Sequence, residues 1–335
     1  MAETGGPLPS VAVVGCGYWG KNIVRNFAEL GALVAVSDAS EAAASALSKQ
    51  HGVPSRTVVD LLADPSVQAM AFASPAPLHA EHARAALEAG KHVFVEKPLA
   101  LTVQDASDVV HLAHQKGLTL MVGHLLRYHP AVEALTALAD EGGLGRIRHL
   151  VSNRLSLGKV RAEEDVLWSF SPHDISMALA LIGEMPVEVM ATGTAALKAD
   201  VADVVDVSLT FPGGTTARIS ASWLHPYKEH KLTVIGEAGQ AVFDDTQGLA
   251  QKLAIYRHEA GYRDGVPTVS KSGPEFVQLS AGEPLKSECA HFLSCIVNGA
   301  TPRTDGVEAL RVLAVLDAAS RSLKSGHKER PLAVD

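Results

Sequence analysis

The chain has 335 residues, of which 47% are apolar and 20% are charged, so it is long enough to bury a core in each of two domains. Its net charge of −8 argues against a nucleic-acid partner, which would favour a basic surface. No apolar run approaches the ~20 residues needed to span a membrane, and the first residues lack the basic start and apolar run of a secretory signal.

The cysteines and histidines do not form the patterns that stabilise small domains. Cys16, Cys289 and Cys295 have neither the paired spacing of a disulfide framework nor that of a zinc site. His111 and His114 lie at helical spacing, but no further ligand is near them in the sequence. We therefore expect a cytoplasmic protein without a metal.

Short apolar runs alternate with helical patterns in the first part of the chain. This alternation is typical of a parallel sheet with crossover helices. We expect strands at residues 11–14, 33–36, 67–73, 92–95 and 118–122. We expect helices at residues 20–30, 40–52, 78–89 and 102–116, most of them ending at a glycine.

The second half has a different pattern. Residues 205–211 and 217–223 alternate apolar and polar side chains on either side of a Pro-Gly-Gly turn. A period of two around a glycine turn predicts an antiparallel hairpin with one buried face. Further strands are expected at 232–235 and 241–243, and helices at 283–298 and 306–324.

These elements predict an α/β domain with the Rossmann arrangement over residues 1–125. An α+β domain with a large, mostly antiparallel open sheet is expected over residues 126–335, and its last helix can pack back on the first domain. The chain contains no internal repeat.

A glycine-rich turn joins the first strand to the first helix. Residues 15–20 read Gly-Cys-Gly-Tyr-Trp-Gly, which is the dinucleotide-binding pattern in its required context. Gly15 allows the tight turn, Gly17 lets the backbone approach a pyrophosphate, and Gly20 allows close packing of the helix on the strand. The pyrophosphate would then face the positive end of the helix. The alternative is that these glycines serve only a tight strand–helix turn.

Asp38 ends the second strand at the distance expected for a ribose-binding acid. Its carboxylate can accept hydrogen bonds from both ribose hydroxyls and would repel a 2′-phosphate. No arginine follows it directly. The sequence therefore predicts NAD in preference to NADP.

Two further segments, Ser-Pro-Ala-Pro-Leu-His at 74–79 and Glu-Lys-Pro at 96–98, complete a family pattern. With the glycine turn, they resemble the glucose–fructose oxidoreductase / inositol dehydrogenase (Gfo/Idh/MocA) family over nearly the whole chain. The resemblance implies an NAD-binding Rossmann domain and a second domain for substrate binding and oligomerisation. It also implies a homodimer or homotetramer that oxidises or reduces a secondary hydroxyl of a sugar or cyclitol.

Hydride transfer from an alcohol requires a base for the hydroxyl proton and a donor that holds the forming carbonyl oxygen. Lys97 follows a parallel strand, at the edge where open α/β sheets bind their ligands. The resemblance implies that His173 is the second catalytic residue. The alternatives are a surface lysine before a proline and a helix-start histidine bonded to backbone.

One position departs from the family pattern. An aspartate commonly lies four residues before the histidine, and this chain has Ser169 there. A serine cannot stabilise an imidazolium as a carboxylate can, so catalysis is expected to depend on Lys97 and His173 as a pair. Asp174 is interpreted as a helix N-terminal acid or a substrate contact.

The expected binding residues come from the glycine turn, the ends of the strands and the segments around the histidine. The expected cofactor contacts are Gly15, Gly17, Tyr18, Trp19, Gly20, Asp38, Ser74, Pro75, His79, Glu96 and Lys97, with His79 near the nicotinamide ribose. The expected substrate contacts are His124, Arg127, Tyr128, Arg154, Lys159, Glu164, Asp165, Ser169 and Asp174. For the segment that contains Arg127 and Tyr128, the start of a domain-linking helix is an equal alternative.

Segments 18–22, 167–168 and 222–228 resemble family members of nucleotide-sugar and antibiotic-sugar biosynthesis. Such enzymes oxidise a ring hydroxyl, often at C3, before an aminotransferase acts. The basic residues Arg154, Lys159 and Arg161 would suit a sugar diphosphate.

The acidic run at 163–165 would instead suit the ammonium groups of an amino-sugar, as in gentamicin-type aminoglycoside pathways, and it is slightly preferred. Both charged runs could also be solvated loops. An inositol-type cyclitol dehydrogenase is disfavoured by Ser169. A non-catalytic NAD-binding regulator is disfavoured by Lys97 and His173.

Overall fold

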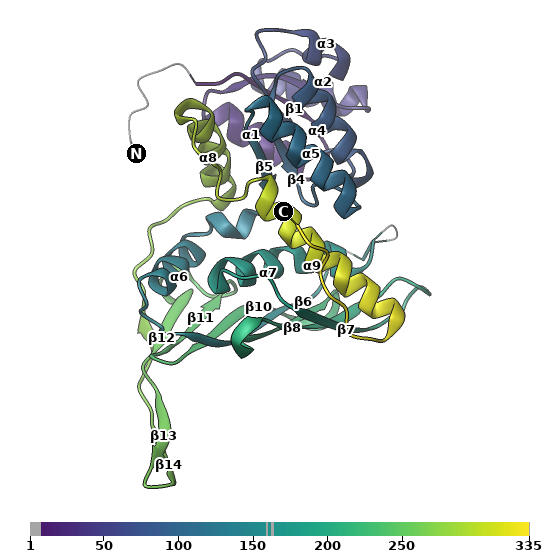
Figure 1. Cartoon of the computed structure of the whole chain (residues 1–335). Helices are drawn as coiled ribbons and strands as arrows, with labels where there is room; N and C mark the ends of the chain where they lie inside the picture. The colour runs from purple at the N-terminus through teal and green to yellow at the C-terminus, as the bar shows by residue number, and fades with distance from the viewer. Residues whose placement is uncertain (1–7, 159, 162–163, 335) are drawn as a thin grey trace. The chain divides into compact units, whose positions relative to one another are not determined.

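The computed structural model describes residues 8–158, 160–161 and 164–334. The chain forms two units (Figure 1). Unit 1 contains the described residues up to Tyr128 together with Gly282–Leu313, and unit 2 contains His129–Ala281 and Ala314–Ala333. The sequence assigned everything after residue 125 to the second domain, whereas the structure assigns the stretch 282–313 to the first unit.

Unit 1 contains a five-stranded parallel sheet in the order β2–β1–β3–β4–β5. Its strands are β1 (Val11–Val14), β2 (Leu33–Ser37), β3 (Ala69–Phe72), β4 (His92–Glu96) and β5 (Leu120–Gly123). Its helices are α1 (Gly20–Glu29), α2 (Glu41–His51), α3 (Val58–Ala63), α4 (His79–Glu88), α5 (Val103–Lys116) and α8 (Pro284–Asn298), with short helices η1 (Ala76–Leu78) and η2 (Leu125–Tyr128). The predicted Rossmann architecture is confirmed.

The strand order places a topological switch point beside β1. The strand that follows β1 in the sequence pairs on one side of it, and β3 pairs on the other side. Every residue of β1, β3 and β5 is buried, as expected for strands covered on both faces. Ligands of open α/β sheets bind outside the carboxyl ends of the strands at such a point.

Three aromatic rings join α8 to the first unit. Phe292 of α8 makes edge contacts with Phe27 of α1 at 6.3 Å and with Phe94 of β4 at 5.8 Å between ring centroids. Phe27 and Phe94 also contact each other at 6.3 Å. Because all three rings are fully buried, they fix α8 against the parallel sheet although it lies far along the chain.

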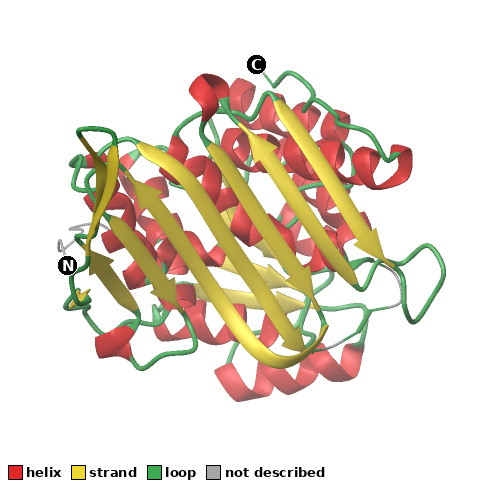
Figure 2. Cartoon of the chain, turned by 90° about the horizontal axis from the view of Figure 1, so that it is seen from below, coloured by secondary structure: helices red, strands yellow, loops and turns green. Residues whose placement is uncertain are grey.

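Unit 2 contains an eight-stranded sheet in the order β15–β12–β11–β10–β6–β9–β8–β7 (Figure 2). Only β6 and β9 pair in parallel within it, so the predicted mostly antiparallel sheet is confirmed. Its strands are β6 (Ile147–Leu157), β7 (Glu188–Thr194), β8 (Val204–Thr210), β9 (Thr216–Ser222), β10 (Leu224–Gly236), β11 (Gln240–Asp244), β12 (Leu253–Tyr256) and β15 (Glu275–Phe276). A separate hairpin is formed by β13 (Glu259–Arg263) and β14 (Val266–Ser270).

Helices α6 (Pro130–Asp140) and α7 (Val166–Ile182) lie on the same side of this sheet in Figure 1. Helix α7 packs on β6, β8 and β9. The predicted hairpin is present as β8 and β9, joined by the short helix η3 (Pro212–Gly214). Helix α9 (Gly306–Ser325) begins in unit 1 and continues into unit 2. Among the described residues, no helix has the length and apolar character needed to cross a membrane.

A carboxyl group on α8 is buried in unit 1 and has no hydrogen-bond partner among the described residues. Glu288 of α8 is 0% exposed, and neither of its carboxyl oxygens has a partner among the described residues. Burial, with the nearby charge of Glu96, raises the pKa of Glu288 well above its usual range. The folded protein therefore favours the neutral carboxylic acid at this position.

Glu288→Gln should remove one component of the pH dependence of stability. Because the folded pKa is raised, the contribution of Glu288 is fully present below the unfolded pKa of 4.5 and is lost as pH rises towards the folded pKa. Above the unfolded pKa, the wild-type free energy of unfolding should fall by up to about 1.4 kcal/mol per pH unit more steeply than that of the variant. Urea denaturation at a series of pH values measures the difference. Glu88→Gln, at an exposed position on α4, should keep the wild-type slope, and equal slopes for wild type and Glu288→Gln would contradict the assignment.

Candidate functional site

The glycine turn connects β1 to α1 at the carboxyl end of the sheet. Gly15 has a φ of +101° and donates its backbone N–H to the carbonyl oxygen of Ser37 at 2.8 Å. A Cβ at Gly20 would lie 1.9 Å from the carbonyl oxygen of Gly15, so only glycine fits there. A Cβ at Gly17 would meet nothing within 4 Å. The open space at Gly17 is therefore available to a pyrophosphate, whereas Gly15 and Gly20 are required by the turn itself.

Asp38 is held beside this turn by two backbone groups. Its Oδ2 accepts the N–H of Cys16 at 2.6 Å, and its Oδ1 accepts the N–H of Ser40 at 2.7 Å. Cys16 has a buried thiol whose pKa is raised to about 11 by burial and by the Asp38 charge, which disfavours the reactive thiolate.

A cavity of about 1010 Å³ lies over the turn within unit 1. Its lining includes Gly15, Gly17, Asp38, Ser74 and Pro75, all of which the sequence assigned to the cofactor. The cavity and the open glycine fit a bound dinucleotide, and Asp38 would face the ribose.

The sequence did not identify Arg56 as a residue of this cavity. Its guanidinium group forms an ion pair with Asp64. The pKa of Asp64 is lowered to about 2, mainly by hydrogen bonds from Ser66 and further by Arg56. The positive charge of Arg56 is therefore already balanced by a carboxylate.

His79 has a structural role that the sequence did not predict. It is 2% exposed, and its two ring nitrogens lie 2.7 Å from the carbonyl oxygens of Pro98 and Ser74. Burial lowers the pKa of His79, and the contacts with the two carbonyl oxygens act in the opposite direction. His79 thereby joins the segments that follow β3 and β4, and its place near the nicotinamide ribose stays a prediction.

The aromatic residues of the glycine turn lie at the surface of unit 1. Tyr18 is 79% exposed, and the Nζ of Lys21 lies 5.3 Å from its ring centroid. Trp19 donates its indole N–H to the carboxylate of Glu96. The glycine turn is thereby joined to the end of β4.

The ends of β4 and β5 bring three chemically active residues together. Glu96 pairs in register with Gly123, and a Cβ at Gly123 would lie only 3.0 Å from a Glu96 carboxyl oxygen. Lys97 follows Glu96 and His124 follows Gly123, so both segments leave the sheet at its carboxyl edge. Burial raises the pKa of Glu96. The hydrogen bond from Trp19 and the charges of Lys97 and His124 act in the opposite direction and lower it.

His124 contacts an acid that the sequence did not identify. Its Nδ1 lies 2.5 Å from Oε2 of Glu308 in the first turn of α9. The other oxygen of Glu308 lies 3.6 Å from the guanidinium group of Arg127. The predicted substrate contacts His124 and Arg127 therefore share one carboxylate.

The prediction that Tyr128 contacts the substrate is corrected, because Tyr128 is a core residue. It is 1% exposed, and its hydroxyl lies 3.0 Å from the hydroxyl of Thr304. Burial raises its pKa well above the usual range, and the guanidinium group of Arg303 lies 4.8 Å from its ring centroid. Neither the hydroxyl nor the ring remains available to a sugar.

In unit 2, the acidic run before α7 has structural partners. Asp165 is the N-cap of α7, where its carboxylate accepts the N–H of Trp168 at 3.0 Å, and burial raises its pKa. Glu164 forms an ion pair with Arg161 at 3.0 Å. The predicted contacts Lys159 and Glu163 lie outside the described residues.

His173 and Ser169 lie one turn apart within α7 and so share a face of the helix. Pro172 precedes the histidine inside the helix, where it cannot donate the usual backbone hydrogen bond. Because α7 begins at Val166, the alternative of a helix-start histidine is wrong. His173 lies in unit 2 and Lys97 lies in unit 1.

Asp174 is buried in an ion pair in the middle of α7. It is 0% exposed and accepts hydrogen bonds from Arg154 at 2.6 and 3.1 Å and from Ser152 at 2.6 Å. The predicted helix N-terminal position of Asp174 is therefore wrong. The ion pair also occupies the guanidinium group of Arg154, which the sequence assigned to a sugar diphosphate.

The sequence did not single out His230, which pairs with Arg154 across β10 and β6. The pKa of His230 is lowered to about 4, mainly by burial and further by the positive charges of Arg154 and Lys228. Its ring is therefore neutral at physiological pH, beside the Arg154–Asp174 ion pair.

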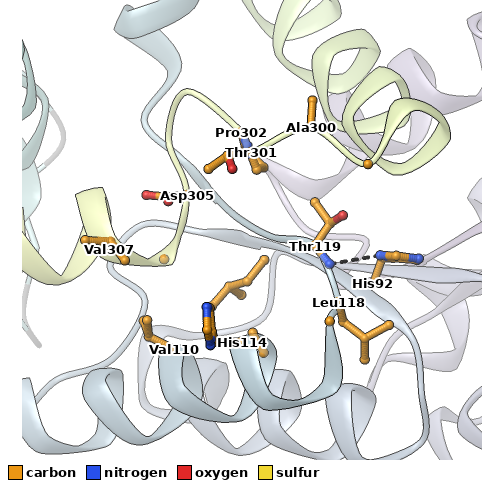
Figure 3. A pocket seen from close by; sticks show the side chains of 15 residues that line it. His92, Val110, His114, Leu118, Thr119, Ala300, Thr301, Pro302, Asp305 and Val307 are labelled. Carbon is orange, nitrogen blue, oxygen red and sulfur yellow. Dashed lines mark hydrogen bonds between the residues drawn. The ribbon is translucent and has the colours of Figure 1, made fainter.

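A second cavity, of about 270 Å³, lies near the amino ends of β4 and β5 (Figure 3). Its lining includes His92, His114 and Asp305, and Nδ1 of His92 accepts the N–H of Thr119 at 2.9 Å. Because Lys97 follows the opposite end of β4, this cavity is separate from the candidate site. Within the described ranges, no group of three or more His, Cys, Asp or Glu side chains could hold a metal ion.

The parallel sheet, the open glycine turn, the acid beside it and the lysine at a strand end are together typical of a nucleotide-dependent oxidoreductase. Residues 10–124 match the model of the oxidoreductase family with an NAD-binding Rossmann fold, and residues 132–242 match the GFO/IDH/MocA C-terminal domain. The chain belongs to the Gfo/Idh/MocA family of oxidoreductases.

The chain is similar to UDP-N-acetylglucosamine 3-dehydrogenase of Acidithiobacillus ferrooxidans, with 31% identity over 304 residues that cover 90% of this chain and 93% of the relative. A solved structure of that enzyme covers 94% of this chain and 97% of its own, with a TM-score of 0.84 and 29% identity. Inositol 2-dehydrogenase of Rhizobium meliloti is 26% identical over 302 residues, which cover 87% of this chain and 89% of the relative.

Gly17→Ala and Gly20→Ala should have different effects. A methyl group at Gly17 meets no protein atom within 4 Å, so the variant should keep the wild-type melting temperature and lose affinity for NAD. A methyl group at Gly20 would clash with backbone and should lower stability by about 1–3 kcal/mol. Thermal unfolding and NAD titration measure the two effects, with Gly248→Ala as a control in unit 2. Wild-type NAD affinity in Gly17→Ala would contradict the proposed pyrophosphate position.

Proposed function

We propose that this protein is an NAD-dependent dehydrogenase that oxidises the C3 hydroxyl of a nucleotide sugar of the UDP-N-acetylglucosamine type to a ketone. The reaction class rests on one observation, the position of Lys97 at the carboxyl end of β4, beside Glu96 and at the same edge of the sheet as the glycine turn. The substrate class is carried by the full-length relative of that activity. A ketone at C3 is the group that an aminotransferase would consume next.

Bound NAD would supply the hydride acceptor. Lys97 would hold the reacting hydroxyl by a hydrogen bond and would stabilise the negative charge that develops on its oxygen. His173 would accept the hydroxyl proton as general base. Ser169, one turn away on α7, offers a hydroxyl to this histidine in place of a carboxylate charge, so Lys97 would contribute most of the electrostatic stabilisation.

We further propose a preference for NAD over NADP. The Asp38 carboxylate is fixed by the N–H groups of Cys16 and Ser40, so it cannot readily move away from a 2′-phosphate. Arg56, the basic residue of the same cavity, is paired with Asp64. A 2′-phosphate would therefore face a fixed negative charge without a free counter-charge from Arg56.

The structure of unit 2 supports an amino-sugar substrate less than a nucleotide-sugar substrate. It depended on carboxylates before α7 that could bind ammonium groups. Asp165 instead caps α7, and Glu164 pairs with Arg161. A nucleotide sugar is therefore the substrate that we propose, and a homodimer or homotetramer remains the predicted assembly.

Lys97→Met should abolish most of the activity. The variant keeps a side chain of similar length but loses the charge and the hydrogen bonds to the substrate oxygen, so kcat should fall by about 10²–10⁴-fold. NADH formation from UDP-N-acetylglucosamine measures the loss, with myo-inositol and free glucosamine as alternative substrates. Lys116→Met, at an exposed position on α5, should retain wild-type activity. Full turnover by Lys97→Met would contradict the proposed role.

Asp38→Asn should narrow the difference in binding affinity between NAD and NADP. The amide removes the negative charge that repels a 2′-phosphate, so NADP should bind more tightly to this variant than to wild type and NAD more weakly. Titration of both proteins with NAD and NADP measures the four affinities. If wild type bound NADP more tightly than NAD, the proposed role of Asp38 would be refuted.

A further inference from the structure

We propose that the hairpin of β13 and β14 is an arm through which this chain pairs with a second copy of itself, strand β13 against strand β13 of the partner. The hairpin is a separate two-stranded sheet of unit 2 and projects from the end of the eight-stranded sheet at which β12 lies (Figure 1). Strands β13 and β14 contain none of the residues assigned to the reaction, so the pairing stands independently of the proposed function.

The arm is a regular hairpin with a well-defined turn. Its register ends with Arg263 opposite Val266. Asp264 and Gly265 form the turn between them, with φ values of +53° and +78°. Positive φ at both positions is the type I′ geometry, whose twist matches that of the strands, and Asp-Gly is a preferred sequence for it. The turn therefore holds the two strands in one register.

The base of the arm is fixed to the rest of unit 2. The guanidinium group of Arg257 donates to the carbonyl oxygens of Gly143 and Ala238 at 2.6 and 3.1 Å. The backbone N–H of Ser272 donates to Nδ1 of His258 at 3.0 Å. Both ends of the arm are thus anchored by residues that lie just outside its strands.

One face of the arm is apolar and open to solvent. Successive residues of a strand point to opposite faces, so one face carries Ala260, Tyr262, Pro267 and Val269. Every residue of the two strands is exposed, with Tyr262 81% and Val269 69% exposed. A two-stranded hairpin alone is at best marginally stable in water, and further strands stabilise it. The described part of the chain does not supply such strands to the arm.

The two edges of the arm differ in their ability to accept another strand. Residues that flank a type I′ turn form a hydrogen-bonded pair, and pair types alternate along an antiparallel ladder. Tyr262 and Pro267, one step further from the turn, are therefore a non-hydrogen-bonded pair. The backbone groups of Tyr262 and of Ala260 consequently point outward from β13. On β14 the outward position is Pro267, which has no N–H to donate. Strand β13 is thus the available edge, and the proline protects the other.

The sequence of β13 complements itself when two copies run antiparallel. Its residues read Glu-Ala-Gly-Tyr-Arg. A two-fold axis at Gly261 places Ala260 opposite the partner's Tyr262, so that their outward backbone groups exchange hydrogen bonds. The same axis places Glu259 opposite the partner's Arg263, which sets opposite charges across from each other on one face. The backbone and the charges of this edge therefore both select a second copy of the chain.

The product of the pairing is a closed four-stranded sheet in the order β14–β13–β13–β14. It gathers the apolar side chains of both copies on one face, and it leaves no β13 edge for a third copy. Each β13 strand has five residues, far fewer than the roughly 20–30 residues per side of a standard interface. The pairing therefore adds to the predicted homo-oligomer and does not carry it alone.

Gly261→Cys tests the register directly. The two-fold axis brings this position of both copies into a non-hydrogen-bonded pair with Cα atoms about 4.5 Å apart, a distance that a disulfide spans. A Cβ at Gly261 meets nothing within 4 Å, and the native cysteines are buried. Under mild oxidation the full-length variant should form a disulfide-linked dimer on non-reducing electrophoresis, which dithiothreitol reverses.

Thr268→Cys is the matched control for the cross-link. Thr268 is an exposed residue that pairs with Gly261 inside the hairpin, but it lies on the outer strand of the proposed four-stranded sheet. This variant should remain monomeric on the same gel. An equal yield of linked dimer from the two variants, or none from Gly261→Cys, would overturn the proposal.

A charge swap tests the pairing without a covalent bond. Arg263→Glu sets like charges opposite each other at both ends of the two-fold contact, so the dissociation constant of the oligomer should rise about 10-fold at low salt. Glu259→Arg should have a similar effect, and the double variant should return to the wild-type value because the opposite charges meet again. Sedimentation equilibrium measures the four constants. Lys271→Glu, an exposed charge reversal just beyond β14, should leave the constant unchanged.

The outcomes distinguish a second copy from other occupants. Cross-linking at position 261, together with recovery in the double charge variant, supports the proposal. A monomeric wild type whose Gly261→Cys variant does not cross-link would mean that the arm binds a different molecule. An oligomer whose dissociation constant is unchanged by both single reversals would have its interface elsewhere. Either of the last two results would contradict pairing through β13.

Discussion

The partly buried carboxylate of Glu96 is the constraint on which the site depends. It accepts the indole N–H of Trp19 from the glycine turn and occupies the space over Gly123 that any side chain would fill. Glu96 and Gly123 are the last registered pair of β4 and β5, and Lys97 and His124 follow them at the carboxyl edge of the sheet. A single carboxyl group thus relates the dinucleotide turn to the end of β4, where Lys97 follows.

The two units contribute different things to the proposed chemistry. Unit 1 holds the cavity over the glycine turn, Lys97 and the pair of His124 and Glu308, whereas unit 2 holds His173 on α7. Around His173, the charged groups are committed to one another: Arg154 to Asp174, and Asp165 to the start of α7. The loss of the usual aspartate at Ser169 is therefore not compensated by Asp165 or Asp174.

The sequence predicted the parts of the fold that depend on local patterns. Buried runs of apolar residues, a period of two and the glycine turn identified the parallel strands, the hairpin of β8 and β9 and the position of Lys97. It could not predict partners that are distant in the chain. Glu308 reaches His124 across 184 positions, and the buried hydroxyl of Tyr128 is paired with that of Thr304, 176 positions away. The burial of His79 depends on a carbonyl oxygen of Pro98, which no side-chain pattern indicates.

The central claim is that the strand ends of unit 1 form a site that removes hydride from C3 of a nucleotide sugar. UDP-N-acetylglucosamine labelled with deuterium at C3 tests this claim most directly, because the label can reach the cofactor only by transfer from that carbon. The account predicts that NADH formed from this substrate carries the deuterium at C4 of its nicotinamide ring. Unlabelled NADH, formed at the same rate as from unlabelled substrate, would contradict it.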